Sequence, residues 1–406
     1  MGWLGLDDTD TLSEGCTTFS LHLLISKLPK HVHVGEVRLV RLWPFARQRT
    51  RGNAAVAVEL TTENVPDLLR FLESYWSVIL QPLAGSVELD GHNQREQSPA
   101  DPGMVWFNEP PSQSDFYQKA VSSEVTLDEV PVADASWGGM GTIGATAAVL
   151  WPQKKVTWEA IGWREEHRWP SGERRVCEST LAEVSSIEGT FLTRDPRTQR
   201  SLISPRGTCP VLFGVRGRTI EAAQQAASML IEAKSTEQVL AWRLFATNQA
   251  TDDHLGVART GRVERVEVLG RGTTVITTEH GRWMAFAESG NVKKMAQTLR
   301  PGDVIESLGL APEQGVLHIE KMRIKSRITE KKRPVCEACQ RTMKSMGSGQ
   351  GVRCPVCKKR QSIGWVEHTT NPDPSDWVQP PPDARRHLAQ PLEWNMSSTS
   401  SVTHNA

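Results

Sequence analysis

The sequence lacks several features that would assign it to a simple class. Asp7, Asp8 and Asp10 interrupt the region in which a signal peptide would need its apolar segment. The longest apolar stretches are too short to span a membrane, so no membrane partner is expected. The chain also has no P-loop lysine motif, and the acidic turn carries no Gly-x-Gly-x-x-Gly, so a nucleotide site at that turn would be of another kind.

The chain has no excess of charge of either sign, with 47 basic and 47 acidic residues. The charge is nevertheless unevenly distributed, because thirteen Lys or Arg and only two acids fall between Lys321 and Arg360. Such a stretch predicts a basic arm for a polyanion on an otherwise acidic body. A solvated linker without a partner is the alternative.

At 406 residues the chain is too long for one hydrophobic core, which predicts several domains in a multidomain α+β protein. Residues 2–6 read as a buried strand that enters an acidic turn, and the spacing of Phe19, Leu23, Leu24 and Leu28 favours a helix after it. The first domain is expected over residues 1–152. Residues 153–250 alternate strand-like and helix-like segments and predict a second α+β domain.

Residues 251–326 change to short strands separated by turn residues, which suits a five-stranded barrel of the OB-fold or SH3-like kind. Residues 330–366 hold two cysteine pairs, and residues 367–394 form a Pro-rich tail. Residues 395–406 have little to bury and are predicted to be disordered.

Cys336-x-x-Cys339 and Cys354-x-x-Cys357 have the spacing of a four-cysteine zinc ribbon. Each pair places two thiolates on one knuckle, and two knuckles complete a tetrahedron around a structural Zn²⁺ with no open position for catalysis. A redox role or chance pairing is the alternative. Free thiols and one metal site indicate a reducing, cytoplasmic environment.

The turn Asp7-Asp8-Thr9-Asp10 places three carboxylates at the end of a strand. Carboxylates this close repel one another, and a cation such as Mg²⁺ would compensate them. Thr17 and Thr18 follow at a helix start, where phosphates bind well. An ordinary polar turn is the competing interpretation.

Three further motifs are weaker. Arg51-Gly52-Asn53 offers a cation and a close backbone approach to a phosphate, and the loop around Gly139 and Gly141 can offer backbone amides to an anion. Taken alone, each motif is more often a plain turn than a phosphate site. The polar run 247–254 reads as a linker more often than as a site.

Together these motifs resemble the archaeal isoleucine-tRNA agmatinylcytidine synthetases over residues 1 to about 394. The resemblance rests on segments in one order, which begin with Gly5–Asp10 and Gly15–Thr18 and continue with 51–53, 102–103, 139–145, 158–164, 205–207, 211–217, 245–254, 349–351 and 380–392.

The resemblance implies a kinase-like domain, a ferredoxin-like domain, an OB-fold and a zinc ribbon. It also implies an ATP-dependent ligase that joins agmatine to C2 of the wobble cytidine of the isoleucine tRNA with a CAU anticodon. In that reaction ATP is cleaved between its α and β phosphates, and a threonine takes up the γ phosphate. The cytosine C2 oxygen must first become a leaving group, which phosphorylation achieves.

Carried over residue by residue, the resemblance implies that Asp7, Asp8 and Asp10 bind Mg²⁺ and phosphates. It makes Thr17 or Thr18 the phosphoacceptor, with Thr17 preferred. The family pattern has basic residues in the loop 138–141, and this chain has none. Arg51, Lys154 and Lys155 are the candidates to replace them.

Two alternatives stay open at this stage. One is a non-catalytic tRNA-binding protein with a degenerate first domain, and the other is a related enzyme that uses a different amine. Spacing does not identify the amine pocket, for which Asp252, Asp253 and the stretch 158–164 are candidates.

Overall fold

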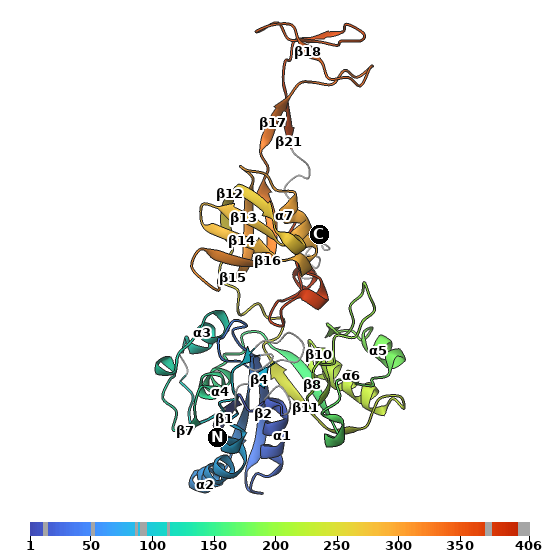
Figure 1. Ribbon diagram of the computed structural model, residues 1–406. Coiled ribbons are helices and arrows are strands. Elements are labelled where there is room, and N and C mark those ends of the chain that lie inside the picture. The colour runs from blue at the N-terminus through green and yellow to red at the C-terminus, as the bar shows by residue number, and fades with distance from the viewer. Residues whose placement is uncertain are drawn as a thin grey trace, which may run out of the picture. The chain divides into compact units, whose positions relative to one another are not determined.

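The computed structural model describes residues 1–10, 15–49, 53–85, 88–89, 96–111, 114–369 and 376–396. The chain forms two compact units, one of residues 1–256 with the C-terminal segment from 382 onward, and one of residues 257–381 (Figure 1). The second unit is therefore an insertion whose two ends both join the first. No helix among the described residues is long and apolar enough to cross a membrane.

The first unit is built on one nine-stranded sheet. Its spatial order is β7-β6-β1-β3-β2-β11-β8-β10-β9, and every pairing is antiparallel except that of β11 with β2. The strands are β1 (Gly2–Asp7), β2 (His33–Arg41), β3 (Ala54–Thr61), β6 (Gly103–Phe107), β7 (Ala135–Gly138), β8 (Thr157–Arg164), β9 (Thr190–Phe191), β10 (Val211–Gly217) and β11 (Val239–Thr247).

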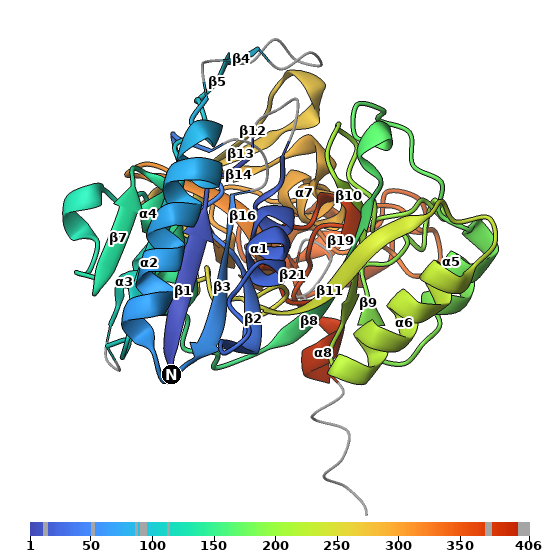
Figure 2. The same cartoon turned by 90° about the horizontal axis from the view of Figure 1, so that it is seen from below.

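Helices cover both faces of this sheet, which explains why β3 is apolar almost throughout. Val56 and Val58 face a core shared with α1 and α2, and Ala55 and Ala57 face a core shared with α3 and α4 (Figure 2). The helices of this unit are α1 (Thr17–Ser26), α2 (Val65–Tyr75), α3 (Phe116–Ser122), α4 (Gly141–Val149), α5 (Glu178–Val184), α6 (Ile220–Glu232) and α8 (Glu393–Met396). Short helical turns are η1 (Trp76–Leu80), η2 (Gln81–Leu83), η3 (Leu127–Glu129), η4 (Glu166–Arg168) and η7 (Pro382–Ala384), and β4 (Glu88–Leu89) pairs with β5 (Glu96–Gln97).

The expected division at residue 152 does not interrupt the sheet. β8, β10 and β11 belong to the second predicted domain, yet Ala246 and Thr247 of β11 pair with Arg38 and Leu39 of β2. Helix α6 packs against β8 and β10 around Leu212, Val215 and Leu230. The two predicted domains therefore share one continuous hydrogen-bonded layer.

The second unit begins with a closed five-stranded barrel in the order β12-β13-β14-β16-β15, where β12 also pairs with β15. Its elements are β12 (Arg259–Val268), η5 (Gly270–Gly272), β13 (Thr274–Thr278), β14 (Gly281–Ala285), η6 (Ala287–Ser289), α7 (Asn291–Gln297), β15 (Val304–Leu310) and β16 (Val316–Ser326). Trp283, Ile276 and Met322 fill its core. The five predicted strands are confirmed to within a few residues.

Beyond the barrel, the cysteine-bearing segment forms small sheets rather than a large core. Its strands are β17 (Thr329–Lys332), β18 (Lys344–Ser345), β19 (Val352–Arg353), β20 (Arg360–Gln361) and β21 (Val366–Thr369). Its buried cluster consists only of Cys336, Met343, Val352 and Cys354. So small a core needs a further stabilising group such as a metal.

The C-terminal segment is not a separate tail in its described part. The amides of Ala250 and Asp252 donate to the carbonyls of His387 and Leu388, each at 2.8 Å. Gln390 N in turn donates to Asp252 Oδ1 at 2.7 Å. The segment is therefore part of the first unit. Of residues 395–406, predicted to be disordered, Asn395 and Met396 instead complete helix α8, and 397–406 lie outside the described residues.

Candidate functional site

A cavity of about 390 Å³ opens in the first unit beside the carboxyl ends of β1 and β2. Both halves of the nine-stranded sheet line it. Its polar lining includes Asp7, Asp8, Asp10, Thr17, Thr18, Arg41, Arg49, Asn53, Glu124, Glu159, Arg216 and His387. The acidic turn and the threonine pair, 7–11 residues apart in the sequence, thus face one space.

The acidic turn has a backbone that orients its carboxylates. Asp8 adopts a φ of 56°, a left-handed conformation that a non-glycine residue rarely occupies. Its amide donates to Asp7 Oδ1 at 2.7 Å, and its own Oδ2 accepts from Asp101 N at 2.9 Å. The first contact closes the turn locally, and the second ties it to the chain that precedes β6.

Burial and mutual repulsion disfavour the ionised forms of these carboxyls. Burial, followed by the charge of Asp8, raises the pKa of Asp7 well above its usual range. Burial also raises the pKa of Asp8 to about 6, although the hydrogen bond from the Asp101 amide opposes the rise. An acidic cluster of this kind is electrostatically incomplete without a cation.

The donor set fits Mg²⁺, which takes hard oxygen ligands and commonly binds through one or two carboxylates together with substrate phosphates and water. Asp7, Asp8 and Asp10 line the cavity, but their oxygens do not form a closed ligand group of the kind the cysteines form. An open arrangement leaves coordination positions for phosphate oxygens.

The threonine pair lies at the first turn of α1, after Cys16 in extended conformation. Both side chains are largely buried but line the cavity. Thr17 Oγ1 lies 3.4 Å from both the amide and the hydroxyl of Thr9. Thr18 Oγ1 accepts from the Trp163 indole at 3.3 Å, so a residue of β8 orients it.

The glycine loop 138–141 does not offer free amides to an anion, contrary to expectation. The amides of Gly139 and Gly141 donate to the carbonyls of Pro102 and Asp101, and Met140 N donates to Asp101 Oδ2 at 2.7 Å. Gly139 and Gly141 instead permit close packing, because a Cβ on either would fall within 2.4 Å of Asp101 Oδ1 or Gly103 N.

Gly144, in the first turns of α4, has a direct bearing on the acidic turn. A Cβ at this position would lie 1.8 Å from Asp7 Oδ2. Gly139, Gly141 and Gly144 have the Gly-x-Gly-x-x-Gly spacing, which begins after β7 and runs into α4 and was not among the motifs singled out from the sequence. Here that spacing serves to bring α4 against the Asp7 carboxylate.

Two arginines supply positive charge that the sequence patterns did not indicate. Arg216 Nε contacts Glu159 Oε1 at 3.2 Å and Gln249 Oε1 at 3.0 Å, and Arg41 Nη2 lies 3.8 Å from Glu159 Oε2. Glu159 is 2% exposed, so its charge is held between the two guanidinium groups. Gly214 makes room for it, because a Cβ there would meet Glu159 Oε1 at 2.4 Å.

The polar run 247–254 is a structural part of the site rather than a linker. Thr247, Asn248 and Gln249 are fully buried. Asn248 exchanges hydrogen bonds with the backbone of Arg41, at 2.8 and 2.9 Å, and thereby fixes the end of β2. The linker interpretation was wrong because this run pairs with groups distant in sequence, which local patterns do not reveal.

Only some of the candidates for an amine pocket line the cavity. Asp253 accepts from the Tyr117 hydroxyl at 2.6 Å, and Asp252 binds the C-terminal segment, so neither carboxylate lines the cavity. Within the stretch 158–164, Glu159 and Ile161 do line it. His387 joins them from the C-terminal segment, and the charge of Arg41, with burial next, lowers its pKa well below the usual value.

The lysines proposed to replace a basic glycine loop do not line the cavity. Lys155 Nζ donates to Thr251 O at 3.2 Å and Gln390 Oε1 at 2.9 Å, and neither Lys154 nor Lys155 lines the cavity. Asn53 lines it, with its Nδ2 donating to Trp43 O at 2.6 Å. Arg51 and Gly52 lie outside the described residues.

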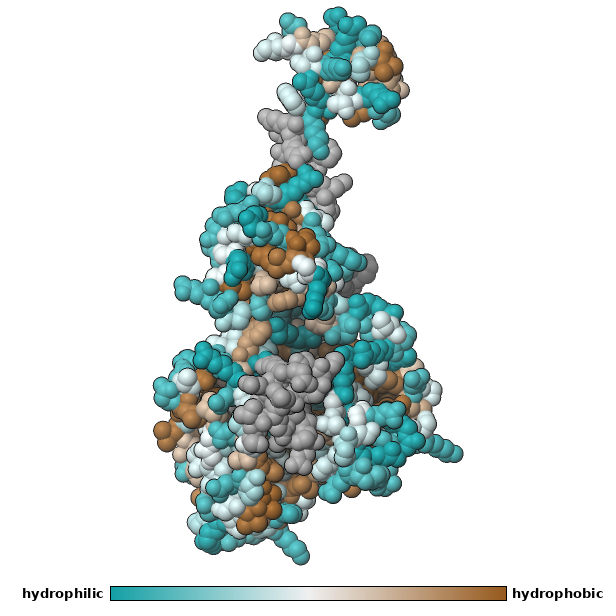
Figure 3. Space-filling model, in the orientation of Figure 1, coloured by the Kyte–Doolittle hydropathy of each residue, from teal (hydrophilic) through white to brown (hydrophobic). Residues whose placement is uncertain are grey.

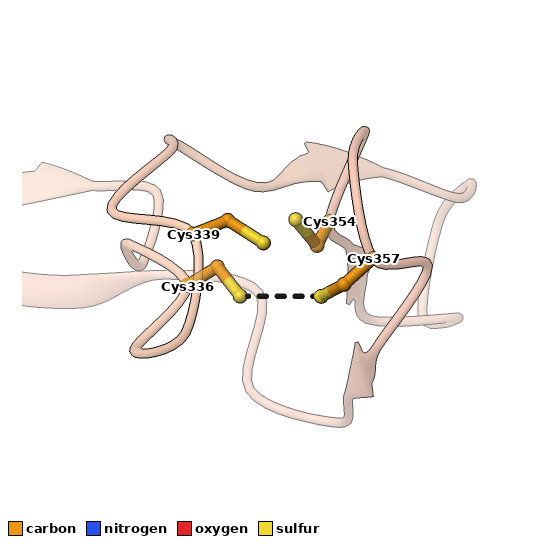
Figure 4. A group of neighbouring side chains, drawn as sticks. All are labelled: Cys336, Cys339, Cys354 and Cys357. Carbon is orange, nitrogen blue, oxygen red and sulfur yellow. Dashed lines mark hydrogen bonds between the residues drawn. The ribbon is translucent and has the colours of Figure 1, made fainter.

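The four predicted zinc ligands lie together in the second unit (Figure 4). Their sulfur atoms are all within 4.8 Å of one another, and Cys336 Sγ lies 3.5 Å from Cys357 Sγ. Among the described residues no other group of three or more metal-ligating side chains gathers as closely. Four sulfurs at this spacing fit a structural Zn²⁺.

The basic stretch is only partly available to a polyanion. Lys321 is 2% exposed in β16, and Arg327 forms a wholly buried ion pair with Asp303 at 2.9 Å. These residues stabilise the barrel, so the basic arm that the charge distribution predicts does not include them. Among the described side chains, Lys325 is exposed, and the other exposed cations of the stretch lie from residue 332 onward.

The first unit contains a cavity whose groups suit phosphate chemistry, and the second unit contains a basic metal-binding module. These two features together define the class of this protein. Three family models match the chain: the TiaS TCKD domain over residues 3–66, the TiaS FLD domain over 139–254 and the TiaS C-terminal zinc ribbon domain over 333–365. The chain belongs to the TiaS family, the isoleucine-tRNA 2-agmatinylcytidine synthetases.

Similar proteins span nearly the whole chain. The 2-agmatinylcytidine synthetase TiaS of Methanopyrus kandleri is 32% identical over 96% of each chain, and that of Archaeoglobus fulgidus is 29% identical over 96% of each. The crystal structure of apo TiaS is similar with a TM-score of 0.79, 27% identity and 97% of each chain covered.

Two solved complexes are also similar in fold. A complex of TiaS with its isoleucine tRNA and ATP matches with a TM-score of 0.75, 27% identity and 97% of each chain covered. A complex of TiaS with the same tRNA, AMPCPP and agmatine matches with a TM-score of 0.71 and 26% identity, covering 97% of this chain and 96% of that one.

Proposed function

We propose that this protein uses ATP to join agmatine to C2 of the wobble cytidine of the isoleucine tRNA with a CAU anticodon, forming agmatidine. The single observation that carries the proposal is the cavity lined by the three aspartates of the acidic turn, the two threonine hydroxyls and three arginines, Arg41, Arg49 and Arg216. The family relationship supports it, because the related solved complexes contain an isoleucine tRNA with ATP, or with AMPCPP and agmatine.

Within this reaction, Asp7, Asp8 and Asp10 hold Mg²⁺ and orient the triphosphate. Bound Mg²⁺ would neutralise charge on the phosphates and favour their transfer. The raised pKa values of Asp7 and Asp8 support this role, since a cation would restore the ionised forms. Gly144 and the Asp101 amide keep the two carboxylates in place.

The hydroxyl of Thr17 or Thr18 takes up the γ phosphate as the β–γ bond breaks, and water cleaves the α–β bond, which leaves AMP and releases the β phosphate as inorganic phosphate. Both hydroxyls line the cavity that the acidic turn faces. Thr17 contacts the turn itself through Thr9, and Thr18 is oriented from β8 through Trp163. Either hydroxyl therefore has an orienting partner and an open side toward the cavity.

Arg41, Arg216 and Asn53 take the place of the basic residues that the glycine loop lacks. The two guanidinium groups lie against one buried carboxylate, Glu159, so the group of three keeps one net positive charge. That charge lines the same cavity as the acidic turn and suits a phosphate group.

We assign the domains as a kinase-like domain over 1–152, a ferredoxin-like domain over 153–250, an OB-fold over 251–326 and a zinc ribbon over 330–366. A Pro-rich tail over 367–394 follows, and its part from 382 onward belongs to the first unit. The barrel has the strand order β12-β13-β14-β16-β15, and α7 lies between β14 and β15 along the chain. Both features support the OB-fold. We place the protein in the cytoplasm, where its tRNA substrate resides.

The nucleotide product tests the proposal. Purified protein given ATP, the tRNA and agmatine should release AMP, and release should require both acceptors. Replacing agmatine with putrescine, which lacks the guanidinium group, should lower AMP formation. Release of ADP alone, or no cleavage with both acceptors present, would contradict the proposal and leave a non-catalytic tRNA-binding protein. Equal use of putrescine would indicate a different amine substrate.

A further inference from the structure

One aromatic side chain of the zinc ribbon lies outside its core. Trp365 is 55% exposed, whereas the buried cluster of the ribbon consists of Cys336, Met343, Val352 and Cys354. An indole this exposed adds little to the stability of the ribbon. Its ring is instead covered on one side by the guanidinium of Arg333, whose Cζ lies 5.2 Å from the ring centroid.

The strand register explains why these two side chains meet. Lys332 is paired with Val366 at the end of the antiparallel β17–β21 ladder. Continuing that register by one residue places Arg333 opposite Trp365, and in an antiparallel ladder residues directly opposite share a face. The cation–π pair is thus held by two adjoining strand ends rather than by two mobile loops.

The surroundings of this pair favour an anionic partner. Between residues 332 and 366 there are eight Lys or Arg and one acid, Glu337. Lys344, Arg353 and Arg360 are cross-strand neighbours in the sheet of β18, β19 and β20. Like charges directly opposite one another destabilise a sheet unless a polyanion neutralises them. Figure 3 shows hydrophobic residues exposed among hydrophilic ones in this module.

We propose that Arg333 and Trp365 form a stacking platform for one unpaired base of the bound RNA. A flat aromatic ring backed by a guanidinium presents a π surface to a base, and proteins recognise single-stranded RNA by such stacking. A fully paired helix offers no free base face, so the platform distinguishes a loop or an end from a duplex. The inference rests on the proposed function only in taking RNA as the partner.

The test compares the affinity of the full zinc-loaded chain for two probes, a transcript of the CAU-anticodon isoleucine tRNA and a blunt, fully paired RNA duplex. Binding is measured without ATP or agmatine across a salt titration, so the outcome does not depend on catalysis. The variants are Trp365→Ala, Trp365→Phe and Arg333→Gln. Ile363→Ala is the matched control, because Ile363 is a similarly exposed apolar residue at 63% exposure.

Trp365→Ala should weaken tRNA binding about tenfold at every salt concentration, because stacking releases no counterions, while duplex affinity stays unchanged. Trp365→Phe should restore most of the loss. Arg333→Gln should weaken binding and lower the salt slope by about one. Ile363→Ala should change binding less than about twofold. Zinc content measured on each variant shows whether the ribbon remains folded.

The proposal is overturned if Trp365→Ala binds tRNA as tightly as the unaltered protein, or if it weakens the duplex equally. It is also overturned if the substitution alters only self-association in sedimentation, which would make this face a protein contact. Should Trp365→Ala lose zinc, Arg333→Gln decides the matter, and an unchanged tRNA affinity in that variant contradicts the platform. A failure of agmatidine synthesis would leave these affinity results intact.

Discussion

At the scale of single residues, the candidate site depends on space as much as on charge. The carboxylate of Asp7 fits only because Gly144 has no side chain, and that of Glu159 only because Gly214 has none. Asp8 accepts a strained φ of 56° in order to direct its carboxylate toward Asp101 N. Such backbone strain is often found at functional sites.

Gly144→Ala should therefore impair the site selectively. A Cβ would lie 1.8 Å from Asp7 Oδ2, so the carboxylate or helix α4 must move. We expect AMP formation to fall at least about tenfold, since small displacements of positioning groups cost rates of that order. Gly207→Ala is the matched control, because Gly207 also lines the cavity but an added Cβ meets nothing within 4 Å. Equal activity of the two variants would refute this steric account.

The threonine pair provides a second test at this scale. Thr17→Val and Thr18→Val each keep the branched shape and delete one hydroxyl, so only loss of the phosphoacceptor should abolish label transfer from γ-labelled ATP. The measurement is phosphopeptide mass spectrometry after incubation. Ser20→Ala removes a neighbouring hydroxyl that bonds to Thr9 and should leave labelling intact. Persistent labelling in the double threonine variant would exclude both residues.

Cysteine reactivity gives a third test. Hydrogen bonds, first from Ser179 and then from Ser235 and Thr180, lower the pKa of Cys177 to about 6, whereas burial raises that of Cys16 to about 11. The thiolate is the reactive form, so at pH 7 Cys177 should be alkylated by iodoacetamide well before Cys16. Its rate should level off above pH 7, while that of Cys16 should still rise. Peptide mapping that finds Cys16 modified first would contradict this order.

At the scale of elements, local patterns identified strands and helices well, but they did not identify which of them meet. Strand β1, helix α1 and the five barrel strands follow from runs of apolar residues and turn signals. Arg41, Glu159 and Arg216 come from β2, β8 and β10, and only the sheet order makes them neighbours. The role of the run 247–254 was missed for the same reason.

The zinc ribbon was predictable because its ligands are close in sequence. Cysteine spacing alone identified the four sulfurs that the structure gathers within 4.8 Å. The charge count of the basic stretch was a poorer guide, because it did not separate Lys321 and Arg327, buried in the barrel, from the exposed cations of the ribbon. Counting charge gives a net field, whereas burial decides which charges a partner can reach.

The three-stranded sheet of the ribbon yields the prediction at this scale. Replacing Lys344, Arg353 and Arg360 together by glutamine removes the row of cross-strand cations. If each contacts a phosphate, the slope of log affinity against log salt should fall by about 2–3. Fluorescence anisotropy with labelled tRNA over a salt series measures the slope. A slope equal to that of the unaltered chain would show that the cations of this sheet do not contact RNA phosphates.

At the scale of the whole molecule, the chain leaves the first unit at residue 256 and returns to it at residue 382. The returning segment pairs with Ala250 and Asp252 and brings His387 to the lining of the cavity. The proposed catalytic cavity is therefore complete only when the whole chain has been made. Its acidic turn, its arginines and its histidine come from three distant parts of the sequence.

The central claim is that this cavity converts a wobble cytidine to agmatidine. Its most direct test is nucleoside mass spectrometry of the CAU-anticodon isoleucine tRNA after incubation with the protein, ATP, Mg²⁺ and agmatine. Agmatidine should replace the wobble cytidine with the unaltered protein. Asp8→Asn, which keeps the volume and removes a hard anionic ligand, should give none while still binding the tRNA. Unmodified cytidine with the unaltered protein, or normal agmatidine formation by Asp8→Asn, would contradict the account.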